Sequence, residues 1–136
     1  MAKHLRQHGS PEALVSEARK TLACKFAAHA HSEGETGTAV NGLVLFRHTS
    51  PSACYPAMCE PSLSIFVQGR KIINLGGTEY LCDGASFLVS SIDVPIQSQI
   101  LEASEAVPFL SMRLRLDVSA VQEILNGEDL PVPDAS

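Results

Sequence analysis

The chain has 136 residues and a formal net charge of −5 at pH 7, with 15 acidic side chains against 10 Lys and Arg. This length suits one domain with its own core. The excess of acidic over basic side chains argues against direct binding of nucleic acid by this chain. No apolar run approaches the roughly 20 residues of a membrane helix, and the polar first residues are not followed by the apolar core of a signal peptide. We therefore expect a cytoplasmic protein without membrane contact.

The cysteines give no sign of a metal or redox motif. Cys24, Cys54, Cys59 and Cys82 are too widely spaced for a C-x-x-C pattern. We expect them to be reduced and to serve mainly in packing.

A helix is the first predicted element. Ser10 suits the N-cap, Pro11 the first helical position, and Glu12 lies near the positive end of the helix dipole. Apolar residues then recur at helical spacing to about Ala28, and their stripe is expected to pack on a sheet. Residues 31–37 are small, polar and glycine-bearing, which predicts a loop.

Residues 40–94 read mostly as short strands. Alternating apolar residues predict a strand over residues 40–48. Three prolines between Thr49 and Pro61 argue against helix and central strand, so an ordered, irregular connection is expected there. From Glu60 to Val94 the turns at Gln68-Gly69-Arg70, Gly76-Gly77 and Asp83-Gly84 separate four runs, which predicts a meander of consecutive antiparallel neighbours.

The last third continues the pattern and closes on a helix. Asp93-Val94-Pro95 is expected to break the chain, and alternation predicts strands over residues 96–101 and 109–116 with a turn between them. Asp117 is expected to cap a short helix that ends near Asn126-Gly127, and the remaining tail reads as a linker. About seven antiparallel strands between two helices favour a mainly β jelly-roll-like sandwich or barrel.

Several motifs stand out between Gly42 and Leu125. They are Glu60–Lys71 (EPSLSIFVQGRK), Leu75-Gly76-Gly77 with Tyr80 and Asp83, Phe87–Pro95 (FLVSSIDVP), Glu102-Ala103-Ser104, Pro108-Phe109-Leu110 and Leu114–Asp117 (LRLD). At these spacings they resemble the N-terminal domain of AraC-type transcriptional regulators, and the resemblance extends from about Gly42 to Leu125.

The resemblance implies a cupin-like domain that binds an unknown small-molecule effector, forms a homodimer and has no enzymatic activity. In such regulators two helix-turn-helix motifs follow. No basic recognition helix is visible here, so we expect a fragment that reaches DNA only through a missing C-terminal domain. The expected organisation is a helix and loop over residues 1–38, a cupin-like β barrel over 39–117, and a helix with the start of a linker over 118–136.

Catalytic and metal sites find little support in the sequence. His29, His31 and Glu35 have some of the residue types of a cupin metal site, but they precede the first predicted strand, and a solvated helix end explains them. We therefore assign no metal, no cofactor and no catalytic residue. His48 is expected to be structural or on the surface, and Cys59 to pack.

A ligand site in a barrel would be lined by inward side chains of facing strands with a few polar groups. Alternation alone does not show which face is inward. Arg47 and Arg113 are the most interesting, because a guanidinium can pair bidentately with a carboxylate, although ion pairs with Glu60, Glu79 or Glu102 would explain them equally. The full set of candidates is Arg47, Tyr55, Ser62, Ser64, Gln68, Tyr80, Ser90, Gln99 and Arg113.

Three hypotheses about function follow. The favoured one is the effector-sensing and dimerisation domain of a transcription regulator. A small metal-dependent cupin-type enzyme and a ligand-free dimerisation module are the alternatives. The final helix carries Val121, Ile124 and Leu125 as an apolar stripe, which we expect to form the dimer interface or else to cap the core of its own domain.

Overall fold

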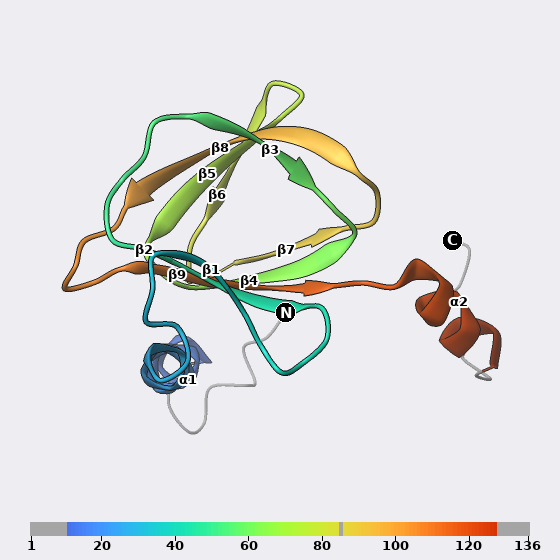
Figure 1. Ribbon diagram of the computed structural model, residues 1–136, viewed down its shortest axis with the longest axis horizontal. Coiled ribbons are helices and arrows are strands. Elements are labelled where there is room, and N and C mark those ends of the chain that lie inside the picture. The colour runs from blue at the N-terminus through green and yellow to red at the C-terminus, as the bar shows by residue number, and fades with distance from the viewer. Residues whose placement is uncertain (1–10, 85, 128–136) are drawn as a thin grey trace.

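The fold is a sandwich of two antiparallel sheets, with one helix before the strands and one after them in the chain (Figure 1). The computed structural model describes residues 11–84 and 86–127. The five-stranded sheet has the order β1 (Gly34–Gly37), β2 (Leu43–His48), β9 (Phe109–Arg115), β4 (Ser62–Gln68) and β7 (Phe87–Ser90). The four-stranded sheet has the order β3 (Tyr55–Cys59), β8 (Val94–Glu102), β5 (Arg70–Leu75) and β6 (Thr78–Cys82). The mainly β, jelly-roll-like class is thus confirmed, with nine strands in the described residues in place of about seven.

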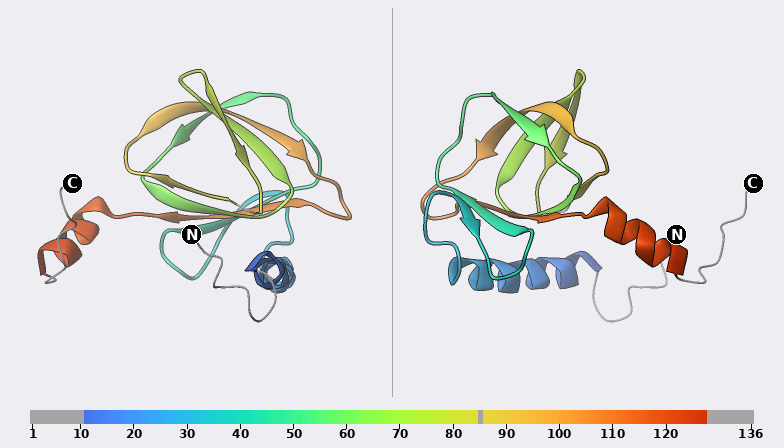
Figure 2. Two further views of the ribbon diagram at one scale, coloured as in Figure 1. Left: turned by 180° about the vertical axis from the view of Figure 1, so that it is seen from behind. Right: turned by 45° about the vertical axis from the view of Figure 1, so that its right-hand side comes forward.

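Helix α1 (Pro11–Ala27) packs on the outer face of the five-stranded sheet, and its end agrees with the prediction. Phe26, which is 3% exposed, joins Leu45, Val67 and Leu110 in a buried cluster beneath the helix. These three strand residues come from β2, β4 and β9, so one apolar stripe of the helix covers three neighbouring strands. The molecule is therefore layered in the order α1, five-stranded sheet, four-stranded sheet (Figure 2).

A second apolar cluster fills part of the space between the sheets. Phe66 and Phe109 from the five-stranded sheet meet Ile73, Cys82 and Ile100 from the four-stranded sheet. The two phenyl rings lie 6.4 Å apart between centroids. Both sheets are therefore anchored on a shared aromatic core.

The expected meander is wrong in two of its three connections. Only β5 and β6 pair as a hairpin, through Gly76 and Gly77, which both have positive φ. The turn at Gly69 carries the chain from β4 in one sheet to β5 in the other, and β6 and β7 likewise belong to different sheets. Short glycine turns can therefore mark a corner between sheets as well as a hairpin.

Two strands occupy segments that were expected to be irregular. Residues 34–37 form β1 at the edge of one sheet, and Tyr55–Cys59 form β3 at the edge of the other. Pro56 fits there because an edge strand can leave one side unpaired. Pro95, where a break was expected, lies inside β8 opposite Met58 and beyond the stretch of β8 that pairs with β5, so its missing N–H leaves that second ladder intact.

Helix α2 (Val118–Gly127) extends away from the sandwich, and none of its residues is buried (Figures 1 and 2). Asp117 caps it as expected, since the backbone N–H of Ala120 donates to its Oδ1 at 3.2 Å. The expected N-cap Ser10 and the tail after Gly127 lie outside the described residues. Among the described helices, none is long and apolar enough to cross a membrane.

Candidate ligand-binding site

A cavity of about 350 Å³ lies between the two sheets. Its wall is contributed by inward side chains of β1, β2, β4 and β9 on one side and of β3, β5 and β8 on the other, with Leu88 of β7 at one edge. This volume is near the lower end of the range for small-molecule sites, roughly 300–1,000 Å³. The cavity can therefore hold a small ligand.

The polar character of the wall follows from strand alternation. On β4, Leu63 and Ile65 are on the helix side of the sheet, while Ser62, Ser64 and Phe66 line the cavity. On β9, Leu110 and Met112 pack beneath the helix. The alternate residues Phe109, Ser111 and Arg113 line the cavity. The more polar face of the five-stranded sheet thus points into the sandwich, because α1 covers the more apolar one.

Two cations at the cavity lie against aromatic rings. The Arg113 guanidinium carbon is 5.2 Å from the centre of the Phe46 ring, and the Lys71 ammonium nitrogen is 6.0 Å from that of Phe109. Both Lys71 and Arg113 are half-buried. Cation–π attraction contributes about 0.5–2 kcal/mol in such settings.

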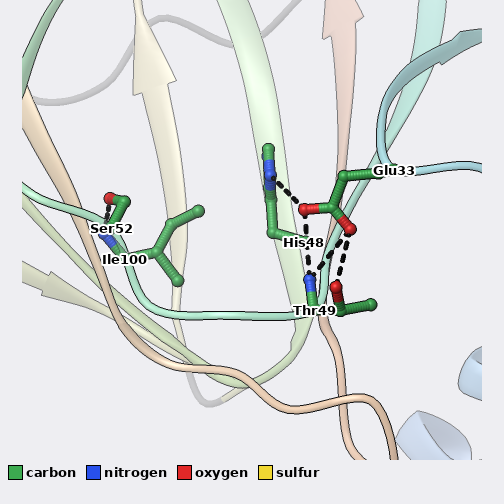
Figure 3. A network of polar contacts seen from close by, with 5 residues as sticks. All are labelled: Glu33, His48, Thr49, Ser52 and Ile100. Atoms are coloured by element: carbon green, nitrogen blue, oxygen red, sulfur yellow. Dashed lines mark hydrogen bonds and ion pairs between the residues drawn. The ribbon is translucent and has the colours of Figure 1, made fainter.

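The Glu33 carboxylate contacts His48, which lines the cavity, and Thr49, which follows β2 (Figure 3). Glu33 accepts hydrogen bonds from the backbone N–H of Thr49 at 3.1 Å and from its hydroxyl at 2.9 Å. The Nδ1 atom of His48 lies 3.5 Å from the same carboxylate. Glu33 therefore joins the loop before β1 to the strand that carries His48 into the cavity wall.

The pKa values of Glu33 and His48 are both lowered, for different reasons. The hydrogen bond from the Thr49 side chain is the main cause that lowers the pKa of Glu33, and His48 adds to it. Burial lowers the pKa of His48 more than the Glu33 charge raises it, and the positive charge of Lys71 lowers it further. At neutral pH the imidazole is therefore mainly neutral, and its contact with Glu33 is best described as a hydrogen bond.

The four cysteines lie at separate places in the fold. None of the four is in a disulfide, as expected. Burial raises the pKa of the Cys82 thiol, which keeps it protonated inside the shared core. Cys59 lines the cavity at the end of β3.

Four of the nine ligand-site candidates line the cavity: Tyr55, Ser62, Ser64 and Arg113. One of these, Ser62, already donates its hydroxyl to the Glu60 carbonyl at 2.8 Å. Within the described residues, neither Arg47 nor Arg113 has an ion pair. Two of the acids considered as their partners bind other arginines, Glu60 with Arg115 and Glu102 with Arg70.

The other five candidates lie away from the cavity. Arg47 is on the helix side of β2, opposite Leu110. Gln68 follows a bulge in β4 and donates to the Pro108 carbonyl. Tyr80 is 46% exposed on the edge strand β6. Ser90 donates to the Ile92 carbonyl, and Gln99 lies opposite Ile72 on β8.

Several cavity residues were not recognised from the sequence. His48, Lys71 and Glu60 line the wall, as do the aromatic residues Phe46 and Phe109. Alternation places Phe46 and His48 on one face of their strand and Leu45 on the other, but it does not show which face is inward. Only the pairing of β5 with β8 and β6 places Lys71 in the sandwich, because that strand has apolar residues on both faces.

The histidines considered for a metal site remain at the end of α1. His29 and His31 are exposed, as is Glu35 on β1. Within residues 11–84 and 86–127, no group of three or more His, Cys, Asp or Glu side chains is arranged to hold a metal ion.

A larger hollow of about 590 Å³ opens at the surface beside Arg19, Arg70 and Glu102. Arg70 is already paired with Glu102 there, at 3.2 Å. Both of these side chains are well exposed to solvent, so the interior cavity offers a ligand far more enclosure and remains the better candidate site.

Comparison with known families agrees with this architecture. The family model described as AraC-type transcriptional regulator N-terminus matches residues 39–135, which include eight of the nine strands and α2. No curated protein sequence matches the chain significantly. The matched region covers most of the chain and contains every strand that borders the cavity except β1. The chain therefore belongs to the family of AraC-type transcriptional regulator N-terminal domains.

Proposed function

We propose that this domain senses a small-molecule effector for a bacterial AraC-type transcription regulator and that the effector binds in the cavity between the two sheets. The observation that carries the proposal is the cavity itself, whose wall combines serine hydroxyls and cations with an apolar surface. Such a mixture suits recognition of a small organic molecule. The role is regulatory, in the cytoplasm, and involves no catalysis by this domain.

Strand β9 supplies a route from the cavity to the rest of a regulator. Ser111 and Arg113 contact the cavity, and the same strand continues through Asp117 into α2. β9 is the middle strand of its sheet, paired with β2 on one side and β4 on the other. We propose that the effector changes the position or the pairing of α2 and that a C-terminal helix-turn-helix region responds to this change.

Homodimer formation is part of the same proposal. Val121, Ile124 and Leu125 are 41%, 61% and 54% exposed on α2. An apolar stripe of this kind gains stability when a second copy covers it. The homodimer would place two sensory cavities on one regulator.

Filling the cavity tests the proposed function. Ala57 on β3 is half-buried in the cavity wall, so Ala57→Phe places a ring where the ligand would bind. We expect compounds from a library of neutral and charged metabolites to raise the Tm of the wild-type domain by several degrees. Ala57→Phe should abolish those shifts.

The matched control is Ala53→Phe, which adds the same ring at an exposed position between β2 and β3. It should keep the wild-type response. A library that stabilises neither the wild-type domain nor the control, or one that stabilises Ala57→Phe equally, would count against a ligand in this cavity.

A further inference from the structure

The cavity wall carries two cations that come from different sheets. Arg113 is on β9 of the five-stranded sheet and Lys71 on β5 of the four-stranded sheet. In the described parts of the chain, neither group forms an ion pair or a hydrogen bond, and each lies near an aromatic ring. Since a partly buried cation loses hydration, a ring contact alone compensates it incompletely.

The acidic residues beside the cavity are not ion-pair partners of Arg113 or Lys71. Glu60 pairs with Arg115, with 3.6 Å between the nitrogen and the oxygen. Glu35 is exposed on the edge strand β1 and lies beyond ion-pair distance of the described cations. Acidic residues outnumber basic ones in the whole chain by 15 to 10, so the two unpaired cations do not reflect a shortage of acids.

Hydroxyl groups and an apolar wall accompany the cations. Ser64 is directly opposite Arg113 in the pairing of β4 with β9, and Ser111 precedes Arg113 by two residues on the same face. Neither hydroxyl is hydrogen-bonded to another described residue, so both can donate to a ligand. Ile73, Leu88 and Ile96 form an aliphatic wall in the same cavity.

We propose that the effector is an organic acid with an apolar body. Its carboxylate pairs with Arg113 and accepts from Ser64, Lys71 adds a second positive charge, and the body of the ligand lies on the aliphatic wall. This inference rests on the proposed function and adds the chemical class of the effector. A cavity of about 350 Å³ suits a short alkyl or single-ring carboxylate.

Matched acids and amides test the charge directly. Hexanoate with hexanamide, and 3-phenylpropanoate with 3-phenylpropanamide, have nearly the same shape within each pair but differ in charge. Kd values come from titrations followed by ¹H–¹⁵N NMR of the domain, with the amide signals of Ser64 and Ser111 as reporters of the cavity. We expect at least one acid to bind about tenfold or more tightly than its amide.

Substitution of the two cations supplies the second part of the test. Arg113→Met and Lys71→Met should weaken the binding of the acid about tenfold while that of the amide stays nearly unchanged. Arg47→Met, on the helix side of β2, and Arg70→Met, whose side chain pairs with Glu102, are the matched controls and should behave as wild type. The Tm of ligand-free Arg113→Met and Lys71→Met should equal or exceed that of the controls, because a half-buried, unpaired charge is lost.

Different results would contradict the acidic character of the effector and the binding of any effector in the cavity. If an amide binds as tightly as its acid, or if acid binding survives both cavity substitutions, the effector class is wrong although the cavity still takes a ligand. If no member of either pair binds, the anion inference is again overturned. In that case the response of the wild-type domain to neutral metabolites decides the proposed function separately.

Discussion

At the scale of single residues, the positions that matter most are those where the chain changes direction or where a polar group enters the sandwich. Gly69 has φ of +82°, and a Cβ atom there would lie 2.7 Å from the Glu102 carbonyl oxygen and 2.9 Å from the Cα of Phe109. The corner between the two sheets therefore depends on a residue without a side chain.

Gly69→Ala should destabilise the domain by about 2–4 kcal/mol, because backbone strain and a clash with two backbone atoms add together. Urea denaturation measures the loss. Gly77→Ala is the matched control, since its φ of +91° imposes strain but the space around it is open, and it should cost about 1 kcal/mol. Equal losses in the two variants would contradict the role assigned to the close approach at Gly69.

His48 should make the stability of the domain depend on pH. Its pKa is lowered from 6.5 in the folded state by burial, while Glu33 and Lys71 are the charged groups that act on it. The unfolded chain therefore binds more protons near pH 6.5, so stability is full above that pH and is lost as the pH falls through the folded pKa of His48.

His48→Gln removes this contribution and keeps a donor for Glu33. The free energy of unfolding, measured in urea from pH 7.5 to pH 5, should fall more steeply for the wild type than for the variant. The range stops above 4.5, the ordinary pKa of glutamate, because the lowered pKa of Glu33 gives a second loss at more acidic pH. Parallel curves for the two proteins would show that His48 titrates alike in the folded and unfolded chains.

At the scale of elements, alternation and helical spacing predicted α1, α2 and most strands, because these signals are local. The extra strand β3 was missed because Pro56 removes a donor, and only the position at a sheet edge makes that harmless. The inward face of the five-stranded sheet also depends on a distant element. Ser62 and Ser64 look like surface residues until α1 is known to cover Leu45 and Val67 on the other side of the sheet.

Only some of the cavity residues can be predicted from local sequence patterns. Arg113 and the β4 serines follow from alternation once the covered face is known. Lys71 depends on the pairing between strands of the second sheet, which no local pattern contains. Residues such as Gln68 were misplaced because a β-bulge changes the register within β4.

Helix α1 is expected to be a structural element whose contribution is concentrated in one side chain. Phe26→Ala removes a ring that is 3% exposed and touches the cluster beneath the helix. The loss should be about 3–5 kcal/mol by chemical denaturation. Leu14→Ala on the same helix, where the side chain is 60% exposed, should change stability by only about 0.5 kcal/mol. A small effect at Phe26 would mean that the sandwich is stable without the helix.

At the scale of the whole molecule, the sandwich and α2 differ in how they are supported. The strands contribute buried side chains to the cluster between the two sheets and to the one beneath α1, whereas no residue of α2 is buried. A ten-residue helix is marginal on its own in water. Its stability in a regulator is therefore expected to come from contact with a second copy.

The mass of the domain in solution tests this expectation. We expect sedimentation or light scattering to give twice the chain mass of 14.5 kDa for the wild type. Leu125→Asp places a charge in the apolar stripe of α2 and should shift the protein to a monomer. Asn126→Asp adds the same charge one residue further along, beside the stripe, and should remain a dimer.

NMR spectra of the variant show whether Leu125→Asp disrupts only the dimer interface or unfolds the whole domain. Because α2 lies apart from the sandwich, Leu125→Asp should keep the NMR signals of the strand residues and the ligand response of the cavity. A wild-type protein that sediments as a monomer would rule out the dimer under those conditions. If Leu125→Asp remained a dimer instead, another surface of the domain would have to join the two copies.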